Sequence, residues 1–189
     1  MATELGEMLK KYGVLREGHF LLTSGKHSDK YFEKFRILEQ PSVCGAFAKS
    51  VADQFRKDNV TVVCGPTTGG IIIAYEVARQ LGCRCVIAEK GELGRKIGRG
   101  FRLGPEDRVL VVDDVLTTGG SIKETLAAIE PSGAKVIGVG VYVDRSAGVD
   151  FGAPLFGAYR QQVATYEPSA CPLCAKAIPL EEPGRSGKK

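Results

Sequence analysis

One short segment combines the side chains that could hold a sugar phosphate. Residues 109–121 read VLVVDDVLTTGGS. An apolar strand here would deliver two carboxylates, Asp113 and Asp114, to its carboxyl end, where open α/β sheets place their ligands. The Thr/Gly/Ser loop that follows opens a helix and offers hydroxyls and backbone N–H groups to a phosphate. The segment therefore has both acceptors for sugar hydroxyls and donors for a phosphate, as a ribose 5-phosphate requires.

Two further segments offer groups for anions. Residues 65–70, GPTTGG, stand between an apolar strand pattern and a helix pattern, and alone they fit an ordinary turn equally well. Residues 89–102, EKGELGRKIGRGFR, contain four glycines and five Lys or Arg. A flexible basic loop could close over a site, offset the charge of an anionic leaving group and exclude water. A solvated hairpin is the alternative interpretation of this segment.

The elements that position these groups alternate along the chain, which predicts a parallel α/β sheet flanked by helices. Residues 89–104 are predicted to form a loop, and residues 115–120 a turn. The first forty residues predict an N-terminal helix and short strands that form a small hood. Strands are predicted at residues 60–64, 84–88, 108–112 and 135–143, and helices at residues 43–57, 71–81 and 121–129.

Three regions follow from this pattern: residues 1–40 with the hood, residues 41–167 with the α/β core, and residues 168–189 as a Pro/Gly-rich tail. Residues 183–189 are expected to be disordered. The chain has 189 residues, a net charge of +4 and no apolar run long enough for a membrane span. Together with an N-terminus that lacks the apolar region of a signal peptide, this predicts a cytoplasmic protein with an anionic small-molecule substrate.

Most of the six cysteines lie in apolar runs, which is typical of small buried side chains rather than a disulfide framework. Cys171 and Cys174 form a lone CxxC pair. A tetrahedral zinc site needs four ligands, and no second pair or histidine follows this one in the sequence. A tight turn with two thiols is therefore the prediction, although a dimer could pool two such pairs around a metal.

Residues 109–121 resemble the segment that binds phosphoribosyl pyrophosphate (PRPP) in type I phosphoribosyltransferases. That resemblance implies an α/β fold with a central, mostly parallel sheet flanked by helices, and a small N-terminal hood. It implies that Asp113 and Asp114 hold the ribose hydroxyls. It also implies a pyrophosphate loop at Thr67, Thr68 and Gly69. The 5′-phosphate loop that it implies comprises Val115, Leu116, Thr117, Thr118, Gly119, Gly120 and Ser121.

The basic segment resembles the lid of orotate phosphoribosyltransferases, although it lacks the longer, His-containing loop of the better-known bacterial members. The resemblance implies that Lys90, Arg95, Lys96 and Arg99 contact pyrophosphate, partly from a neighbouring subunit. The candidate catalytic residues are accordingly Asp113 and Asp114 together with three of these cations, namely Lys90, Arg95 and Lys96.

The N-terminal residues resemble the hood that covers the base in the same enzymes. Tyr31 and Phe32 match its aromatic pair, whereas Thr23 stands where many members have a lysine and Lys26 follows three residues later. His27 fits either a ligand contact or a turn residue. Arg145 follows the strand that ends at Asp144, and in the family this arginine grips the orotate carboxylate; a surface salt bridge is the alternative. The candidate orotate contacts are Lys26, Tyr31, Phe32, Thr117 and Arg145.

The resemblance implies conversion of orotate and PRPP to orotidine 5′-phosphate and pyrophosphate, a step of UMP biosynthesis. It implies Mg²⁺ bound mainly through PRPP, with a water-mediated contact to Asp113 as an option, and a homodimer that shares its lids. The alternatives are a phosphoribosyltransferase for a purine base and a non-catalytic regulator that senses PRPP. The chain has no room for an added DNA-binding domain and no helix-turn-helix pattern, which argues against nucleic acid as a partner.

Overall fold

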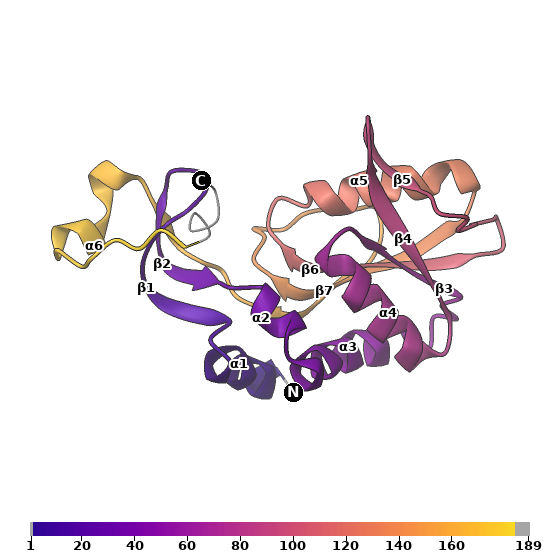
Figure 1. The fold of residues 1–189 in the computed structure, drawn as a ribbon, viewed down its shortest axis with the longest axis horizontal. Coiled ribbons are helices and arrows are strands. Elements are labelled where there is room, and N and C mark those ends of the chain that lie inside the picture. The colour runs from indigo at the N-terminus through magenta and orange to yellow at the C-terminus, as the bar shows by residue number, and fades with distance from the viewer. Residues whose placement is uncertain (1, 184–189) are drawn as a thin grey trace.

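A six-stranded sheet forms the centre of the larger part of the molecule (Figure 1). The computed structural model describes residues 2–183. The strand order is β5-β4-β3-β6-β7-β8, and only β5 is antiparallel to its neighbour. The mostly parallel α/β sheet predicted from the sequence is therefore confirmed. The strands are β3 (Val62–Pro66), β4 (Arg84–Gly91), β5 (Gly94–Ile97), β6 (Arg108–Leu116), β7 (Lys135–Asp144) and β8 (Leu155–Arg160).

Helices cover both faces of this sheet because its inner strands are apolar on both sides. Side chains alternate between the faces: Val63 packs into the cluster under α3 and α4, whereas Val62 and Cys64 pack into the cluster under α5. Figure 1 shows α3 and α4 on the opposite side of the sheet from α5. The helices are α1 (Ala2–Lys11), α3 (Pro41–Phe55), α4 (Gly69–Leu81) and α5 (Gly120–Ile129).

The hood is a separate three-stranded antiparallel sheet at one end of the core (Figure 1). Its order is β1-β2-β9, so the last strand comes from residues that the sequence analysis assigned to the core. Helix α1 packs on β8 and α3 rather than on the hood alone. The strands are β1 (Leu15–Leu21), β2 (His27–Phe32) and β9 (Thr165–Tyr166), and the short helices are α2 (Phe35–Leu38), η1 (Glu130–Ser132), η2 (Pro168–Ala170) and α6 (Pro172–Ala175).

Two predictions about local structure were wrong. Residues 89–97 form a hairpin rather than a loop, because β4 continues to Gly91 and pairs with β5 across a two-residue turn that Gly94 closes with a φ of 90°. Strand β6 does not end at residue 112 but continues to Leu116, since it keeps its pairing with β7 that far. The paired strand therefore extends two residues beyond Asp113 and Asp114, into the segment predicted as a turn.

None of the helices within residues 2–183 is long and apolar enough to cross a bilayer. The disorder predicted for residues 183–189 concerns positions that, apart from Pro183, lie outside the described residues. The tail up to Pro183 returns to the hood, where Leu21 donates a backbone hydrogen bond of 2.9 Å to Glu181.

Candidate functional site

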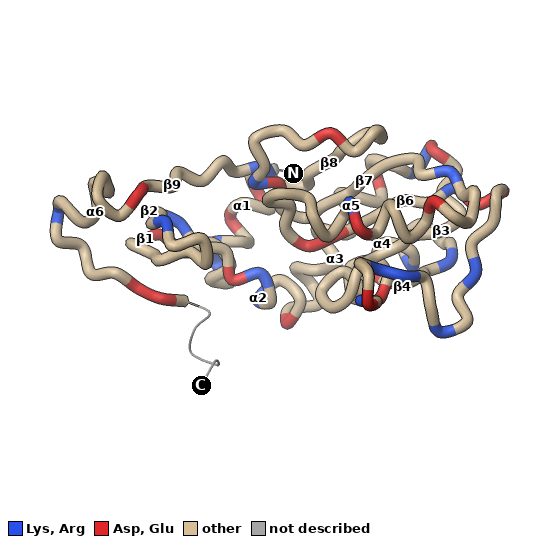
Figure 2. Tube along the Cα trace, turned by 90° about the horizontal axis from the view of Figure 1, so that it is seen from above, with Lys and Arg blue, Asp and Glu red and all other residues tan. Residues whose placement is uncertain are grey.

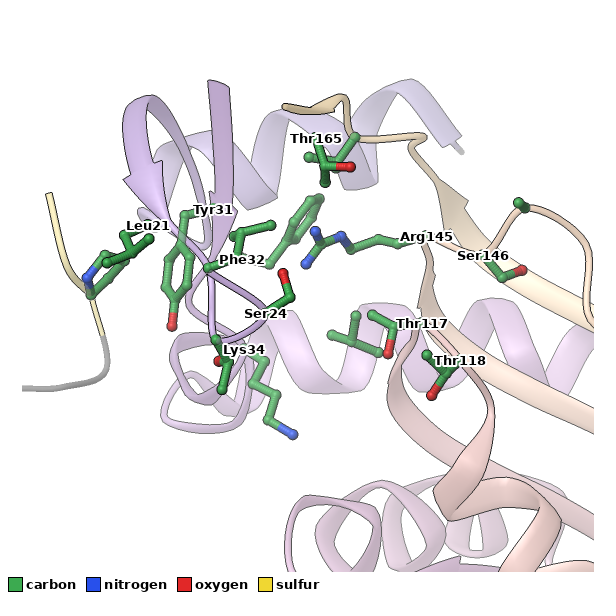
Figure 3. Close-up of a pocket in the computed structure, with 16 residues that line it drawn as sticks. Leu21, Ser24, Tyr31, Phe32, Lys34, Thr117, Thr118, Arg145, Ser146 and Thr165 are labelled. Atoms are coloured by element: carbon green, nitrogen blue, oxygen red, sulfur yellow. The ribbon is translucent and has the colours of Figure 1, made fainter. Parts of the chain in front are cut away.

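A cavity of about 700 Å³ lies between the hood and the carboxyl ends of β6 and β7. This volume falls in the range of small-molecule sites. Figure 3 shows Tyr31 and Phe32 of β2 on the hood side, Thr117 and Thr118 on the loop before α5, and Arg145 reaching from the end of β7 toward Phe32. The cavity thus brings together segments that the sequence analysis assigned to a base and to a phosphate.

Asp113 and Asp114 are both buried at the end of β6. Burial, followed by the negative charge of Asp114, raises the pKa of the Asp113 carboxyl to about 6. Hydrogen bonds from the Asp114 amide, at 2.9 Å, and from the Ser121 hydroxyl act in the opposite direction. These two adjacent carboxylates, with little solvent around them, are called the acidic edge of β6. Their negative charge favours the binding of hydroxyl donors or of a cation.

The raised pKa of Asp113 predicts a pH dependence of stability. In an unfolded chain this carboxyl titrates near pH 3.9, so between about pH 4 and about pH 6 the folded protein binds the additional proton. The contribution of Asp113 to the free energy of unfolding should therefore fall as the pH rises through this window, by on the order of 3 kcal/mol, and change no further above it. Denaturant titrations at about pH 4 and about pH 7 should show that this loss is smaller in Asp113→Asn. Equal losses in both proteins would contradict the raised pKa.

Lys34 is a site residue that the sequence analysis missed. Its ammonium lies 2.9 Å from Oδ2 and 3.2 Å from Oδ1 of Asp114, and it lines the cavity between the hood and the core. The Oδ1 atom of Asp114 also accepts a hydrogen bond of 2.6 Å from the Val115 amide. Lys34 therefore partly neutralises the acidic edge and ties the segment after β2 to β6. Its position two residues after Phe32 was the available signal.

The loop from Thr117 to Gly119 leads into α5 and has the features of a phosphate site. Gly119 has a φ of 79°, and a Cβ there would lie 2.9 Å from the Phe151 ring, so only glycine fits. Within residues 2–183 no side chain caps this helix, and Thr117 and Thr118 are exposed. The first N–H groups of α5 and the hydroxyls of the loop can thus be donated to an anion, favoured by the helix dipole.

The loop after β3 approaches the carboxylates closely. A Cβ on Gly69 would lie 2.5 Å from Oδ2 of Asp114, so the absence of a side chain at this position lets the loop pack against the acidic edge. The Thr67 amide donates a hydrogen bond of 3.0 Å to the carbonyl of Ala88, and the Thr67–Thr68 peptide bond is cis. The structure therefore brings the predicted pyrophosphate loop, residues 67–69, next to the predicted ribose site.

Arg95 joins the two phosphate loops. Its guanidinium donates hydrogen bonds of 3.1 Å to the Thr67 and Ser121 hydroxyls, and its side chain is only 7% exposed. Glu124 of α5 lies 3.4 Å from its Nε atom. Arg95 thus lies beside the place predicted for pyrophosphate, and it holds both loops in one arrangement within a single subunit.

The other predicted lid cations are exposed: Lys90 and Lys96 on the hairpin of β4 and β5, where the tube in Figure 2 has blue segments beside the β4 label, and Arg99 just after the hairpin. Lys90 is paired directly with Arg95, so both point to one face of the hairpin, whereas Lys96 points to the other face. Arg99 forms an ion pair with Glu89. The structure therefore brings Lys90 to the face of the site within one chain, and it does not do so for Lys96 and Arg99.

Arg145 projects into the cavity, and the surface salt bridge expected as its alternative is made by Arg160 instead, whose Nε lies 3.5 Å from Asp144. The Arg145 guanidinium lies over the Phe32 ring, 5.0 Å from its centre. Burial lowers the pKa of Arg145, and its Nε atom is buried without a hydrogen-bond partner in the described part of the chain. A buried guanidinium with an unused donor favours a carboxylate ligand.

Of the remaining hood residues named in the sequence analysis, some line the cavity and others do not. Tyr31, Phe32 and Thr23 line the cavity. Lys26 does not; it forms an ion pair of 2.7 Å with Glu167. His27 is also away from the cavity, because its ring is buried against His19 and Cys174. Neither of the two roles considered for His27 describes this environment.

Comparison with known proteins agrees with this geometry. The phosphoribosyl transferase domain model matches residues 36–152. Orotate phosphoribosyltransferase of Caldanaerobacter subterraneus subsp. tengcongensis is 48% identical over 179 residues, covering 94% of each chain. That of Thermotoga maritima is 44% identical and covers 97% of this chain and 98% of its own length. The crystal structure of orotate phosphoribosyltransferase from Aeropyrum pernix matches with a TM-score of 0.72 and 28% identity, covering 82% of this chain and 93% of that one.

A shared strand order alone would establish only a fold. Here the family model covers more than half of the chain, and the relatives match it over nearly its whole length at more than 40% identity. The chain therefore belongs to the phosphoribosyltransferase family and, within it, to the orotate phosphoribosyltransferases.

Proposed function

We propose that the cavity holds orotate against Arg145 and the hood aromatics, and that PRPP lies along the acidic edge of β6 with its phosphate at the start of α5. The observation that carries this proposal is the unpartnered Nε of Arg145, buried in the same cavity as Thr117 and Thr118. A planar guanidinium can bind a carboxylate through two parallel hydrogen bonds. Orotate carries a carboxylate, whereas uracil, adenine, hypoxanthine and xanthine do not.

In the proposed reaction a ring nitrogen of orotate forms a bond to C1 of the ribose as the bond from C1 to pyrophosphate breaks. Asp113 and Asp114 hold the ribose hydroxyls and fix C1 relative to the base. Negative charge that grows on the leaving pyrophosphate meets the loop of residues 67–69, through the N–H groups of Thr68 and Gly69, and the Arg95 guanidinium. The ring nitrogen loses its proton as the new bond forms, and the departing pyrophosphate, which gains negative charge, can accept that proton. This chain therefore needs no strong general base of its own, and most of the catalysis is positioning and electrostatic stabilisation.

Mg²⁺ fits this site because the buried carboxylates at the end of β6 are hard oxygen donors. When it is bound, chiefly through PRPP, it would neutralise charge on the pyrophosphate. The raised pKa of Asp113 is consistent with a position that a nearby cation stabilises. Asp113 would hold the ion through a water molecule, while Asp114 keeps its contact with Lys34 and the ribose.

The active form is proposed to be a homodimer in which hairpins reach toward the neighbouring site. Ile72 and Tyr75, one turn apart on α4, are 48% and 66% exposed, and Phe35 of α2 is 53% exposed. Such a group of exposed apolar side chains favours an interface. Light scattering should give about twice the 20.2 kDa of one chain, and Tyr75→Arg should shift the mass toward one chain. A wild-type mass of one chain at micromolar concentration would contradict the dimer.

A cytoplasmic location is proposed as well. All six cysteines are free, including the pair Cys171 and Cys174, whose thiols are close enough to share a cluster. Proteins of oxidising compartments usually pair such thiols.

A panel of bases tests the proposed function. Purified protein is mixed with PRPP, Mg²⁺ and one of orotate, uracil, adenine, hypoxanthine or xanthine, and pyrophosphate release is followed. Release with orotate alone is the expected result. Release with a purine would keep the PRPP site but reject the proposed roles of Arg145 and the hood. Protein that binds PRPP but releases pyrophosphate with none of the five would favour a non-catalytic sensor.

A further inference from the structure

Four potential metal ligands converge behind the hood, at a place the proposed reaction does not use. They are His19 of β1, His27 of β2, and the pair Cys171 and Cys174 at α6. One ligand atom from each lies within 4.8 Å of all the others, and all but Cys174 are buried. The two histidines are the only ones in the chain. A Cys₂His₂ set is one of the standard donor sets of structural zinc.

The distances match a tetrahedron around zinc. Nε2 of His19 lies 3.6 Å from the Cys171 sulfur and 3.7 Å from the Cys174 sulfur. Nδ1 of His27 lies 3.3 Å from the Cys174 sulfur and 2.9 Å from Nε2 of His19. Zinc bonds of about 2.0–2.1 Å to nitrogen and about 2.3 Å to sulfur, at tetrahedral angles, separate the ligand atoms by roughly 3.3–3.8 Å. Small movements of the imidazoles would therefore complete the geometry.

The surroundings of His19 fix its ring in a ligand orientation. Nδ1 of His19 lies 2.8 Å from the carbonyl oxygen of Ile178, a bond in which only the nitrogen can donate. That bond leaves Nε2 with its lone pair directed at the cluster. Histidines that bind metals commonly donate their other N–H to a backbone carbonyl in this way, which sets the tautomer. Without a metal, the His27 imidazole and both thiols would compete as donors for the single lone pair of His19 Nε2, whereas a bound cation accepts all four ligand lone pairs.

The segment that follows the hood has little apolar burial to hold it in place. Between Glu167 and Pro183, all of which are described, Cys171 is the only buried residue. A segment of this length with so little apolar burial does not have enough hydrophobic free energy to offset its loss of entropy. Its backbone nevertheless follows β1, through the bonds that Glu181 makes with His19 and Leu21. A metal bound by two strands and by α6 would supply the missing attachment.

We propose that His19, His27, Cys171 and Cys174 form a structural zinc site that fastens the tail, residues 167–183, to the hood. The site also bears on the base. Strand β1 runs from His19 to its end at Leu21, and the turn that follows it, residues 22–24, lines the cavity, as does Pro183 at the end of the tail. If the cavity binds orotate as proposed above, this position means that loss of zinc should raise the KM for orotate more than the KM for PRPP.

Metal content is the first test. The full chain, purified without a histidine tag from zinc-supplemented medium, should contain about one zinc per chain by elemental mass spectrometry. Protein stripped with a chelator should bind Zn²⁺ again with the same stoichiometry. Wild-type protein that contains no zinc and binds none on titration with Zn²⁺, or one in which Cys171 and Cys174 form a disulfide, would overturn the site.

Variants assign the ligands. Cys174→Ser changes the exposed ligand and His27→Asn a buried one, and each should lower Zn²⁺ affinity by at least about tenfold, since loss of an outer contact already costs that much. The matched control is Cys83→Ser, a half-buried thiol outside the cluster, which should keep about one zinc. Loss of zinc in Cys83→Ser as well, or retention in both ligand variants, would reject the assignment.

A measurement on the wild-type chain covers the case in which variants fail to fold. Chelation should lower the Tm and expose the tail to limited proteolysis, and Zn²⁺ should reverse both effects. Unchanged Tm and proteolysis would reject the fastening role. Zinc content is measured without substrate, so protein that holds zinc but does not use orotate would refute the proposed function and leave the site standing. Protein that uses orotate but holds no zinc would refute the zinc site and leave the proposed function standing.

Discussion

Asp114→Asn is expected to lower kcat/KM for PRPP by about 10²–10³-fold while the protein remains folded. The substitution keeps the shape of the side chain but removes its negative charge. That charge would strengthen the hydrogen bonds that the side chain accepts from the ribose hydroxyls, and it pairs with the Lys34 ammonium at 2.9 Å. Charge-assisted hydrogen bonds contribute about 1.5–3 kcal/mol each, so losing two of them at the lower end of this range gives a decrease of this size. Initial rates over a range of PRPP concentrations, at saturating orotate, measure it.

Stability separates a role in the site from a role in folding. Removing the Asp114 charge relieves its repulsion of Asp113, which is one cause of the raised pKa there, while the lost ion pair with Lys34 acts in the other direction. The Tm should consequently change little. Asp58→Asn, at an exposed carboxylate after α3, is the matched control and should keep its activity. An Asp114→Asn enzyme with a normal rate would remove this residue from the ribose site.

The sequence supports the sharpest predictions where the chemistry is contiguous. Asp113, Asp114 and the loop to Ser121 occupy nine successive positions, and a strand followed by a glycine-rich turn is a local pattern. Apolar runs such as Val109–Val112 likewise predict buried parallel strands, because such strands are covered on both faces. The fold class follows from these repeats, and the structure and the family relationship agree with it.

What was missed depends on contacts between distant residues. Lys34 meets a carboxylate 80 positions away, and His19 lies near thiols more than 150 positions away, so no local spacing could reveal either arrangement. The hairpin at residues 89–97 was only the alternative prediction, for a related reason. Its glycines and cations are typical of a loop, and only the pairing between β4 and β5 makes it a strand pair. Two histidines eight residues apart around a turn, together with a CxxC pair, were the available indication of the cluster.

Arg145→Ala is expected to raise the KM for orotate by roughly 10- to 100-fold and to change the KM for PRPP far less. The guanidinium lies over Phe32 at the base end of the cavity, and its Nε donor has no partner among the described residues. Its contribution to binding should therefore come from the orotate carboxylate. Arg145→Lys should recover part of the loss, since an ammonium keeps the charge but not the two parallel donors.

The effect on folding should be small for a specific reason. Removing Arg145 loses its contact with the Phe32 ring, which contributes about 0.5–2 kcal/mol to stability. It also removes a buried donor without a partner, which destabilises the folded state, so the two effects offset each other. Arg160→Ala is the matched control, because this arginine lies near the same sheet edge but pairs with Asp144 and is exposed. It should leave both KM values unchanged. If Arg145→Ala raised the KM for orotate and the KM for PRPP equally, the arginine would be organising the cavity as a whole, and its assignment to the carboxylate would be wrong.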